Sequence, residues 1–330
     1  MELVSPAGSW PAFKKAVDNG ADAIYIGFRD ETNARHFAGL NFDDKNASKA
    51  LNYARSKGKR VYLAINTYPQ TARWSAWQRA VDMAADLGVN AIIAADIGVL
   101  EYASQRHSTL HRHLSVQGSA TNLGALTFYA ENFGIARAVL PRVLSAKQVA
   151  QLASASPVPL EVFGFGSLCI MAEGRCFLSS YVAGASPNTC GACSPASHVS
   201  WKNTGDQLEV WLGDMLVDRF EADENAGYPV ICKGRFIAND KTYHAIEEPV
   251  SLNSMALLPE LIDMGVVAIK LEGRQRSPAY IAKVVSIWRQ AIDAAKSNQP
   301  FVVQPSWTAS LATVAEGGQT TLGAYEREWQ

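Results

Sequence analysis

Four cysteines lie within one stretch of the chain and could together hold a metal centre. They are Cys169, Cys176, Cys193 and Cys232, separated by six, sixteen and thirty-eight residues. Four thiolates can enclose either a zinc ion or an iron–sulfur cluster. Structural zinc usually binds two short Cys-x-x-Cys knuckles, and one such knuckle, Cys190-Gly-Ala-Cys193, is present here. The open spacing favours a cluster held by loops, with zinc, or buried thiols beside a reactive one, as the alternatives.

A second set of polar residues follows the short apolar runs that we predict to be strands. In a parallel α/β barrel the branched apolar side chains point outward to the helices, and alternate positions point into the lumen. Polar residues on the inward phase, or at the strand ends, are Arg29, Asn66, Gln117, Arg142, Lys270, Glu272 and Arg274. The C-terminal ends of barrel strands carry the active site in this architecture, although any one such residue can serve only to satisfy loop backbone.

Several of these side chains are cationic. A cleft that contained Arg29, Arg142 and Arg274, with Lys270 near them, would suit a small substrate with more than one carboxylate, because guanidinium groups bind carboxylates in bidentate fashion.

The segment that follows the second predicted strand carries two further candidates. It reads Asn33-Ala-Arg35-His36-Phe37. It is either a mobile lid that brings Arg35 and His36 to the cleft, or a solvated loop.

Eight β-rich runs alternate with stretches of amphipathic helical spacing. Several follow a glycine that would end a helix, and the eight runs are 19–28, 87–96, 133–142, 264–273, Glu2–Gly8, Val61–Thr67, Leu114–Ser119 and Leu160–Gly166. This alternation predicts an α/β chain, and the count of eight favours a closed (β/α)₈ TIM-barrel-like fold over an open doubly wound sheet.

A long cysteine-rich segment separates the seventh predicted strand from the eighth. We read it as an irregular insert that opens at the C-terminal face of the barrel, because it contains short strand-like pieces and turn signals. The predicted divisions are barrel strands 1–7 over residues 1–166, the insert subdomain over 167–262, the eighth strand and its helix over 263–296, and a segment without clear helical period over 297–330 that wraps the barrel or meets a partner.

The charge balance limits the classes of partner. The chain has 30 Lys and Arg against 31 Asp and Glu, for a net charge of −1. This is not the basic excess of a protein held mainly by nucleic-acid phosphates. No apolar run reaches the ~18 residues of a bilayer span, and the N-terminal residues do not resemble a signal peptide, so we expect a cytoplasmic chain without a membrane span.

One long motif is recognisable. The run from Glu161 to Cys169, followed after four residues by the run from Gly174 to Ser179, resembles the signature of the collagenase-like peptidase family U32 at every fixed position. Flanking segments resemble the ubiquinone-biosynthesis branch of that family, among them MELVSPAG, TNARHFAGLNF, SPNTCGACSPA, KLEGRQRSPAY and TTLGAYEREWQ. The resemblance covers essentially the whole chain.

This resemblance implies an oxygen-independent hydroxylase subunit rather than a peptidase. It implies a [4Fe-4S] cluster on Cys169, Cys176, Cys193 and Cys232, with Cys190 as a departure from the family pattern that could compete with Cys193. It also implies a heterodimer with a homologous UbiV-like subunit, a UbiT-like lipid carrier, prephenate as the hydroxyl donor, and a ubiquinone precursor as the ring that is hydroxylated. The two carboxylates of prephenate agree with the arginine-rich cleft.

If the chain is such a hydroxylase subunit, roles can be assigned to the candidate site residues. The residues that anchor carboxylates are Arg142 and Arg274, with Arg29 and Lys270 as further candidates. The residues assigned to the reaction are Asn66 and Gln117, which would orient hydroxyl groups, and Glu161, which would act as an acid or base or be a buried structural anchor.

Three other functions compete with this one. A family member that hydroxylates a tRNA or rRNA base should carry a basic RNA-binding surface, and the best basic run here, 55–60, is more simply a helix end. A collagenase-like peptidase requires a nucleophile and a base, and no motif for them is found. A non-enzymatic scaffold would use the cluster only to stabilise a partner interface.

Overall fold

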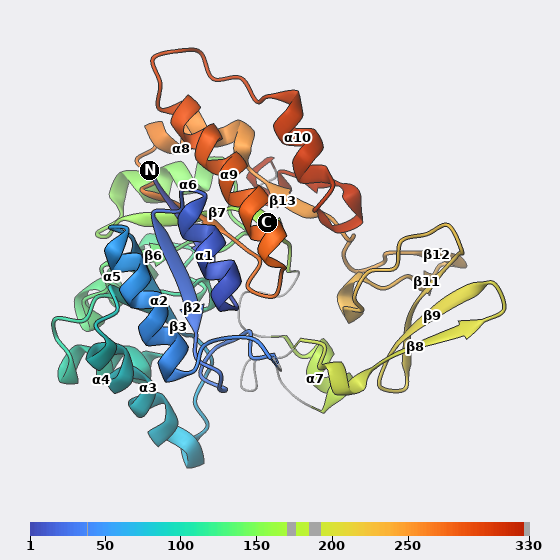
Figure 1. The fold of residues 1–330 in the computed structure, drawn as a ribbon, viewed down its shortest axis with the longest axis horizontal. Coiled ribbons are helices and arrows are strands. Elements are labelled where there is room, and N and C mark those ends of the chain that lie inside the picture. Colours follow the sequence, from blue (N-terminus) through green and yellow to red (C-terminus); the bar gives the residue numbers. More distant parts are fainter. Residues whose placement is uncertain (38, 170–175, 185–192, 327–330) are drawn as a thin grey trace.

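The computed structural model describes residues 1–37, 39–169, 176–184 and 193–326. Its centre is a closed barrel of eight parallel strands, as the sequence predicts (Figure 1). The strands are β1 (Glu2–Pro6), β2 (Ala23–Gly27), β3 (Arg60–Ile65), β4 (Ala91–Ala94), β5 (Arg112–Leu114), β6 (Arg137–Val139), β7 (Leu160–Ser167) and β14 (Ala268–Leu271). Because β14 pairs in parallel with both β7 and β1, the barrel closes and the open-sheet alternative is wrong.

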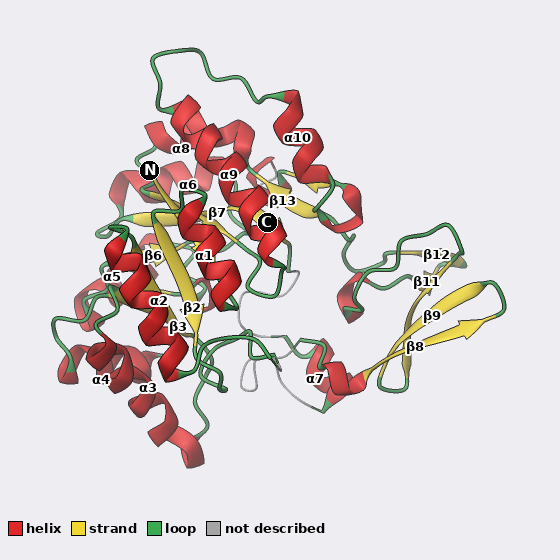
Figure 2. Cartoon of the chain, viewed as in Figure 1, coloured by secondary structure: helices red, strands yellow, loops and turns green. Residues whose placement is uncertain are grey.

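Helices surround the barrel and cover the outward faces of its strands (Figure 2). They are α1 (Trp10–Asp18), α2 (Asp44–Ser56), the short η1 (Thr71–Arg73), α3 (Trp74–Leu87), α4 (Ile97–Arg106), α5 (Leu123–Phe133), α6 (Ala146–Ala155), α8 (Leu258–Asp263) and α9 (Pro278–Ala295). Local sequence sets many of their ends: Asp96 and Ser145 accept backbone N–H bonds as N-caps, and Gly88 ends α3 in the left-handed conformation.

The predicted phase of the strands is confirmed where the barrel meets its helices. Leu63 and Ile269 are fully buried and pack with Trp77 and Trp288 of the surrounding helices in one apolar cluster. A separate cluster, which includes Tyr25 and Tyr62, fills the lumen.

The fifth strand differs from its prediction. We expected it over Leu114–Ser119, but β5 ends at Leu114 and is followed by the 3₁₀ turn η2 (Val116–Gly118). The turn is stabilised locally, because Ser115 accepts a bond from the Gln117 N–H and Ser119 adopts a left-handed φ of 50°. The strand itself begins with the polar residues Arg112 and His113, so the pattern of apolar residues did not show where it starts.

The insert forms a small subdomain that projects from the barrel (Figure 1). Its elements are α7 (Leu178–Ala183), η3 (Ala196–His198), the antiparallel strands β8 (Val199–Thr204), β9 (Gln207–Leu212) and β10 (Met215–Phe220), η4 (Ile231–Lys233), and the hairpin β11 (Phe236–Ala238) and β12 (Lys241–Tyr243). Leu212, Val217 and Ile231 form its own apolar core.

The chain returns to the barrel before residue 262, where we placed the end of the insert. Strand β13 (Ser251–Asn253) pairs antiparallel with β7, and η5 (Met255–Leu257) and α8 follow it. Met255, Leu258 and Leu261 belong to the main apolar cluster. The predicted boundary therefore lies within the packing of the barrel.

The C-terminal segment reaches the C-terminal face of the barrel. It contains α10 (Pro305–Ala312), a helix that the sequence pattern did not show, then η6 (Glu316–Gly318), β15 (Thr320–Thr321) and η7 (Gly323–Glu326). β15 pairs with β13, and the Tyr325 hydroxyl donates to the Phe163 carbonyl of β7 at 3.1 Å. Among the described helices, none has both the length and the apolar character needed to cross a bilayer.

Candidate active site at the C-terminal face of the barrel

Paired charges fill the lower part of the lumen. Glu161, near the N-terminal end of β7, accepts bonds from Lys270 Nζ at 2.8 Å and Arg137 Nη1 at 3.0 Å. Arg137 also binds Glu2 at 2.9 Å, and all four residues are buried. Burial alone would raise the pKa of Glu161, but Lys270 and Arg137 lower it to about 2. Glu161 is therefore an ionised, buried carboxylate, and the Lys270 ammonium is paired with it.

Tyr25 lies next to this charge network. Its ring is 4.0 Å from Lys270 Nζ and 5.6 Å from the Arg274 guanidinium, and its hydroxyl donates to the Leu271 carbonyl at 2.9 Å. Burial raises the pKa of Tyr25 well above its usual range, so the hydroxyl is a neutral donor. This ring joins the lower network to the side chains at the C-terminal opening of the barrel, which we call the mouth.

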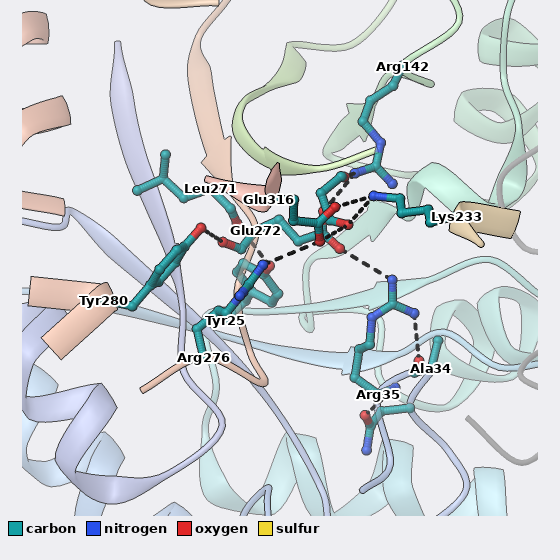
Figure 3. Close-up of polar contacts among 12 residues, drawn as sticks. Tyr25, Ala34, Arg35, Arg142, Lys233, Leu271, Glu272, Arg276, Tyr280 and Glu316 are labelled. Atoms are coloured by element: carbon teal, nitrogen blue, oxygen red, sulfur yellow. Dashed lines mark hydrogen bonds and ion pairs between the residues drawn. The ribbon is translucent and has the colours of Figure 1, made fainter. Parts of the chain in front are cut away.

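Glu272 organises the mouth itself (Figure 3). It follows β14, and its carboxylate binds Arg142 at 2.9 Å and Arg35 at 3.3 Å. Arg142 also donates to the Ser167 carbonyl at 2.6 Å and lies 4.4 Å from the centre of the Phe163 ring. Burial opposes ionisation of Glu272, but the two arginines outweigh it and lower its pKa.

Arg274 differs from the other arginines at the mouth. Only 7% of its surface is exposed, and its Nη1 donates to Asn33 Oδ1 at 3.2 Å. Among the described residues no carboxylate lies within ion-pair distance of it. Burial lowers the pKa of Arg274 to about 10, which still leaves it charged at neutral pH. It is therefore a buried cation whose described partners are a neutral amide and an aromatic ring, an arrangement that favours an anionic ligand.

The remaining predicted residues make no described contact with Glu272 or Arg274. Arg29 is about half exposed, and its guanidinium contacts the Asn41 carbonyl at 3.3 Å and Asp43 at 3.9 Å. Asn66 accepts a bond from the Ala34 N–H at 3.0 Å, so it holds the segment that carries Arg35. Gln117 lies in the η2 turn, where its backbone carbonyl accepts from the Tyr68 hydroxyl at 2.6 Å.

Three residues of the mouth were missed or left undecided by the sequence. Arg35 was assigned to either a lid or a solvated loop, and the structure brings it to Glu272. Asn33 and Tyr25 received no role. For Asn33 the signal is Gly27, because a Cβ at that position would lie 2.7 Å from the Asn33 side chain and 2.9 Å from Arg274 Nη1.

The described cysteines come from four separate segments of the insert and its borders. Cys176 and Cys193 share one neighbour, since the Ser179 hydroxyl lies 3.9 Å and 3.4 Å from their sulfurs. Burial, together with the charges of the other three cysteines, raises the pKa of the Cys232 thiol to about 12. Ser179 therefore links the segments that carry Cys176 and Cys193. Cys190 lies outside the described residues.

The arginine-rich mouth adjoins these cysteines. Burial opposes protonation of Arg35, but Glu272, and after it Cys193 and Cys169, raise its pKa. Within the described ranges, no three His, Cys, Asp or Glu side chains are arranged to hold one metal ion. In an iron–sulfur cluster the thiolates bind different iron atoms, so their sulfurs do not need to converge on a single point.

Comparison with known proteins gives relatives along most of the chain. The model of peptidase family U32 matches residues 8–328. The tRNA hydroxylation protein P of Escherichia coli is 28% identical over an alignment of 340 positions, which covers 97% of this chain and 73% of that protein. An uncharacterized protease of Methanocaldococcus jannaschii is 31% identical over 89% of this chain and 65% of its own length. The 23S rRNA 5-hydroxycytidine synthase of Escherichia coli is 27% identical over 89% of this chain, but only 39% of that protein is covered.

The lower lumen predicts a pH dependence of stability through His113. This side chain is buried against Tyr62, with ring centroids 4.7 Å apart, and faces Glu161, Arg137 and Lys270. Burial lowers the pKa of His113 to about 3. Between about pH 6.5 and pH 3 the unfolded chain therefore binds a proton here that the folded chain does not, and stability falls as the pH falls.

Urea unfolding at pH 7.5 and pH 4.5 tests this. We expect His113→Gln to remove about 2 kcal/mol of the wild-type loss of stability between these values. His111→Gln, a change at an exposed position, should retain the full loss. If the free energy of unfolding fell equally in the two variants between pH 7.5 and pH 4.5, the assignment of this pH dependence to His113 would be wrong.

Proposed function

Because the chain belongs to peptidase family U32, we propose that it is a cytoplasmic subunit of an oxygen-independent hydroxylase acting on the aromatic ring of a ubiquinone precursor. The observation that carries the proposal is a buried arginine without a described carboxylate partner, Arg274, in a mouth where Arg142 donates to the Ser167 carbonyl, two residues before Cys169. Two relatives, named for tRNA hydroxylation and for hydroxycytidine synthesis, support hydroxylation as the reaction class.

The sequence favours an aromatic ring over RNA as the substrate. Segments along the whole chain resemble the ubiquinone biosynthesis protein UbiU, and the net charge of −1 gives no general attraction for a polyanion. RNA hydroxylation is the second candidate, and the names of the two relatives favour it.

We assign Cys169, Cys176, Cys193 and Cys232 to a [4Fe-4S] cluster. The donor set fits because four cysteines are available and two of them share a polar neighbour: Cys176 Sγ donates to Ser179 Oγ, and the same hydroxyl lies within hydrogen-bonding distance of Cys193 Sγ. We assign Cys193 rather than Cys190 as the third ligand on the sequence resemblance. When bound, the cluster would supply electron transfer or a site for an oxygenated donor.

The side chains of the mouth would bind and orient the donor. We assign Arg274 to one carboxylate of prephenate, since this cation has no described anionic partner. A second carboxylate would compete with Glu272 for Arg35 or Arg142, which come from two different segments. Asn66 acts through the backbone of Ala34 and so positions Arg35.

We further propose that the chain works as a heterodimer with a homologous UbiV-like subunit and receives its lipid from a UbiT-like carrier. The insert supports a partner interface because it projects from the barrel (Figure 1) and also exposes large apolar side chains. Those of Phe177, Tyr181 and Ile237 are 73%, 88% and 79% exposed.

The substrate class can be tested directly. The chain is prepared without oxygen together with its homologous partner, and it is supplied with prephenate and either an aromatic ubiquinone precursor or unmodified tRNA and rRNA. We expect mass spectrometry to find one added oxygen atom in the ring and none in the RNA. Hydroxylated RNA with an unchanged ring would replace this proposal by the second candidate.

The cluster predicts a defined response to loss of each cysteine. Anaerobically purified wild-type protein should be brown and contain matched iron and acid-labile sulfide. Alanine at Cys169, Cys176, Cys193 or Cys232 should abolish both, whereas Cys190→Ala should retain them. Zinc without sulfide in the wild type would point instead to a structural four-cysteine site.

Arg274 predicts the affinity for the donor. A hydrogen bond to a charged group contributes about 1.5–3 kcal/mol, so Arg274→Gln should weaken prephenate binding by roughly 10–100-fold. Arg29→Gln is the matched control and should bind as the wild type does, because Arg29 is engaged outside the mouth. Anaerobic titration calorimetry gives both values, and an unchanged affinity in Arg274→Gln would exclude this residue as the anchor.

A further inference from the structure

Glu316 joins three parts of the chain at the C-terminal face. It lies in η6 of the C-terminal segment, and its carboxylate accepts a bond from Ser167 Oγ at 2.7 Å and binds Arg276 at 3.3 Å. It also forms an ion pair with Lys233 (Figure 3). Lys233 in turn donates to Ser167 Oγ at 3.2 Å, so Glu316, Lys233 and Ser167 each contact the other two.

The backbone holds Glu316 in this place. Its N–H donates to Ser251 Oγ at 2.9 Å, and the Ser251 N–H donates to the Gln319 carbonyl at 3.1 Å. Gly317 has a left-handed φ of 57°, and a Cβ there would lie 2.4 Å from the Pro249 carbonyl oxygen. The turn is therefore packed too closely for any other residue at position 317, and it presents the carboxylate in a fixed direction.

Two of the three partners of the Glu316 carboxylate, Ser167 and Lys233, lie close in sequence to assigned cluster ligands. Ser167 is the last residue of β7, two residues before Cys169, and Lys233 directly follows Cys232 in η4. The Lys233 side chain is only 9% exposed. A buried ammonium beside a cluster ligand would stabilise the reduced, more negative state of a bound cluster unless a carboxylate neutralised it.

We propose that Glu316 is a positioning residue for the iron–sulfur cluster. It fixes the separation of the segments that carry Cys169 and Cys232, and it neutralises Lys233 so that the ammonium does not raise the reduction potential. This inference rests on the proposed function, since it requires the cluster. The C-terminal segment is thereby part of the redox site although it contributes no ligand.

Three variants and one control test the proposal. Glu316→Gln leaves Lys233 without its carboxylate, so the midpoint potential should shift upward. Lys233→Met leaves Glu316 without its ammonium, so the potential should shift downward. The double variant should return close to the wild-type value. Glu326→Gln, an exposed change on the same segment, should leave the potential and the cluster content unchanged.

The measurements are iron and sulfide per chain and an anaerobic spectroelectrochemical titration. Opposite shifts that cancel in the double variant support the proposal, because a general loss of packing cannot give shifts of opposite sign. If Glu316→Gln fails to load the cluster, recovery of loading in the double variant also supports it. Unshifted potentials in loaded variants, or equal loss of loading in all three, would overturn it. A wild type without iron and sulfide would instead refute the proposed function itself.

Discussion

The pairing of Glu161 with Lys270 and Arg137 is the interaction on which the rest of the structure depends. Charged groups in a closed barrel are removed from water, and the cost of that transfer is offset only when each charge has a partner in good geometry. These three residues come from β7, β14 and β6, and Glu2 extends the network to β1. The network therefore ties together the strands on both sides of the seam between β7 and β14, where the chain closes the barrel after its long insert.

Closure of that seam decides where the mouth is and what it contains. Paired charges and Tyr25 occupy the lower lumen, and Arg35, Arg142 and Arg274 lie above them, toward the C-terminal ends of the strands. There the charges are not equally engaged. Glu272 holds Arg35 and Arg142, whereas Arg274 has a neutral amide as its described hydrogen-bond partner. This inequality is the basis for proposing that the mouth binds an anion.

Parts of the chain far apart in sequence meet over this mouth. The segment after β2 supplies Asn33 and Arg35, the insert supplies the cysteines and Lys233, and the C-terminal segment supplies Glu316 and Tyr325. Each is fixed by contacts to the ends of β7 or β14. Two strands thus position the groups that we propose bind a ligand, and they also contact the insert that carries the cysteines.

The sequence by itself determined the architecture, the family and the residue types of the site. Strand and helix periods arise from burial along each element, and glycine and capping residues act locally, so the eight strands and the insert could be predicted without tertiary information. The phase along β14 likewise predicted that Lys270, Glu272 and Arg274 point inward. Only the tertiary structure decided how deep each side chain lies and which partner it meets. In the folded chain Lys270 pairs with Glu161, and Arg29 lies near Asp43. Gln117 lies on a turn, and Arg35 and Glu316 lie at the mouth. Loops have no period, and the partner of a charge is set by chain segments hundreds of residues away, so neither can be read from local sequence.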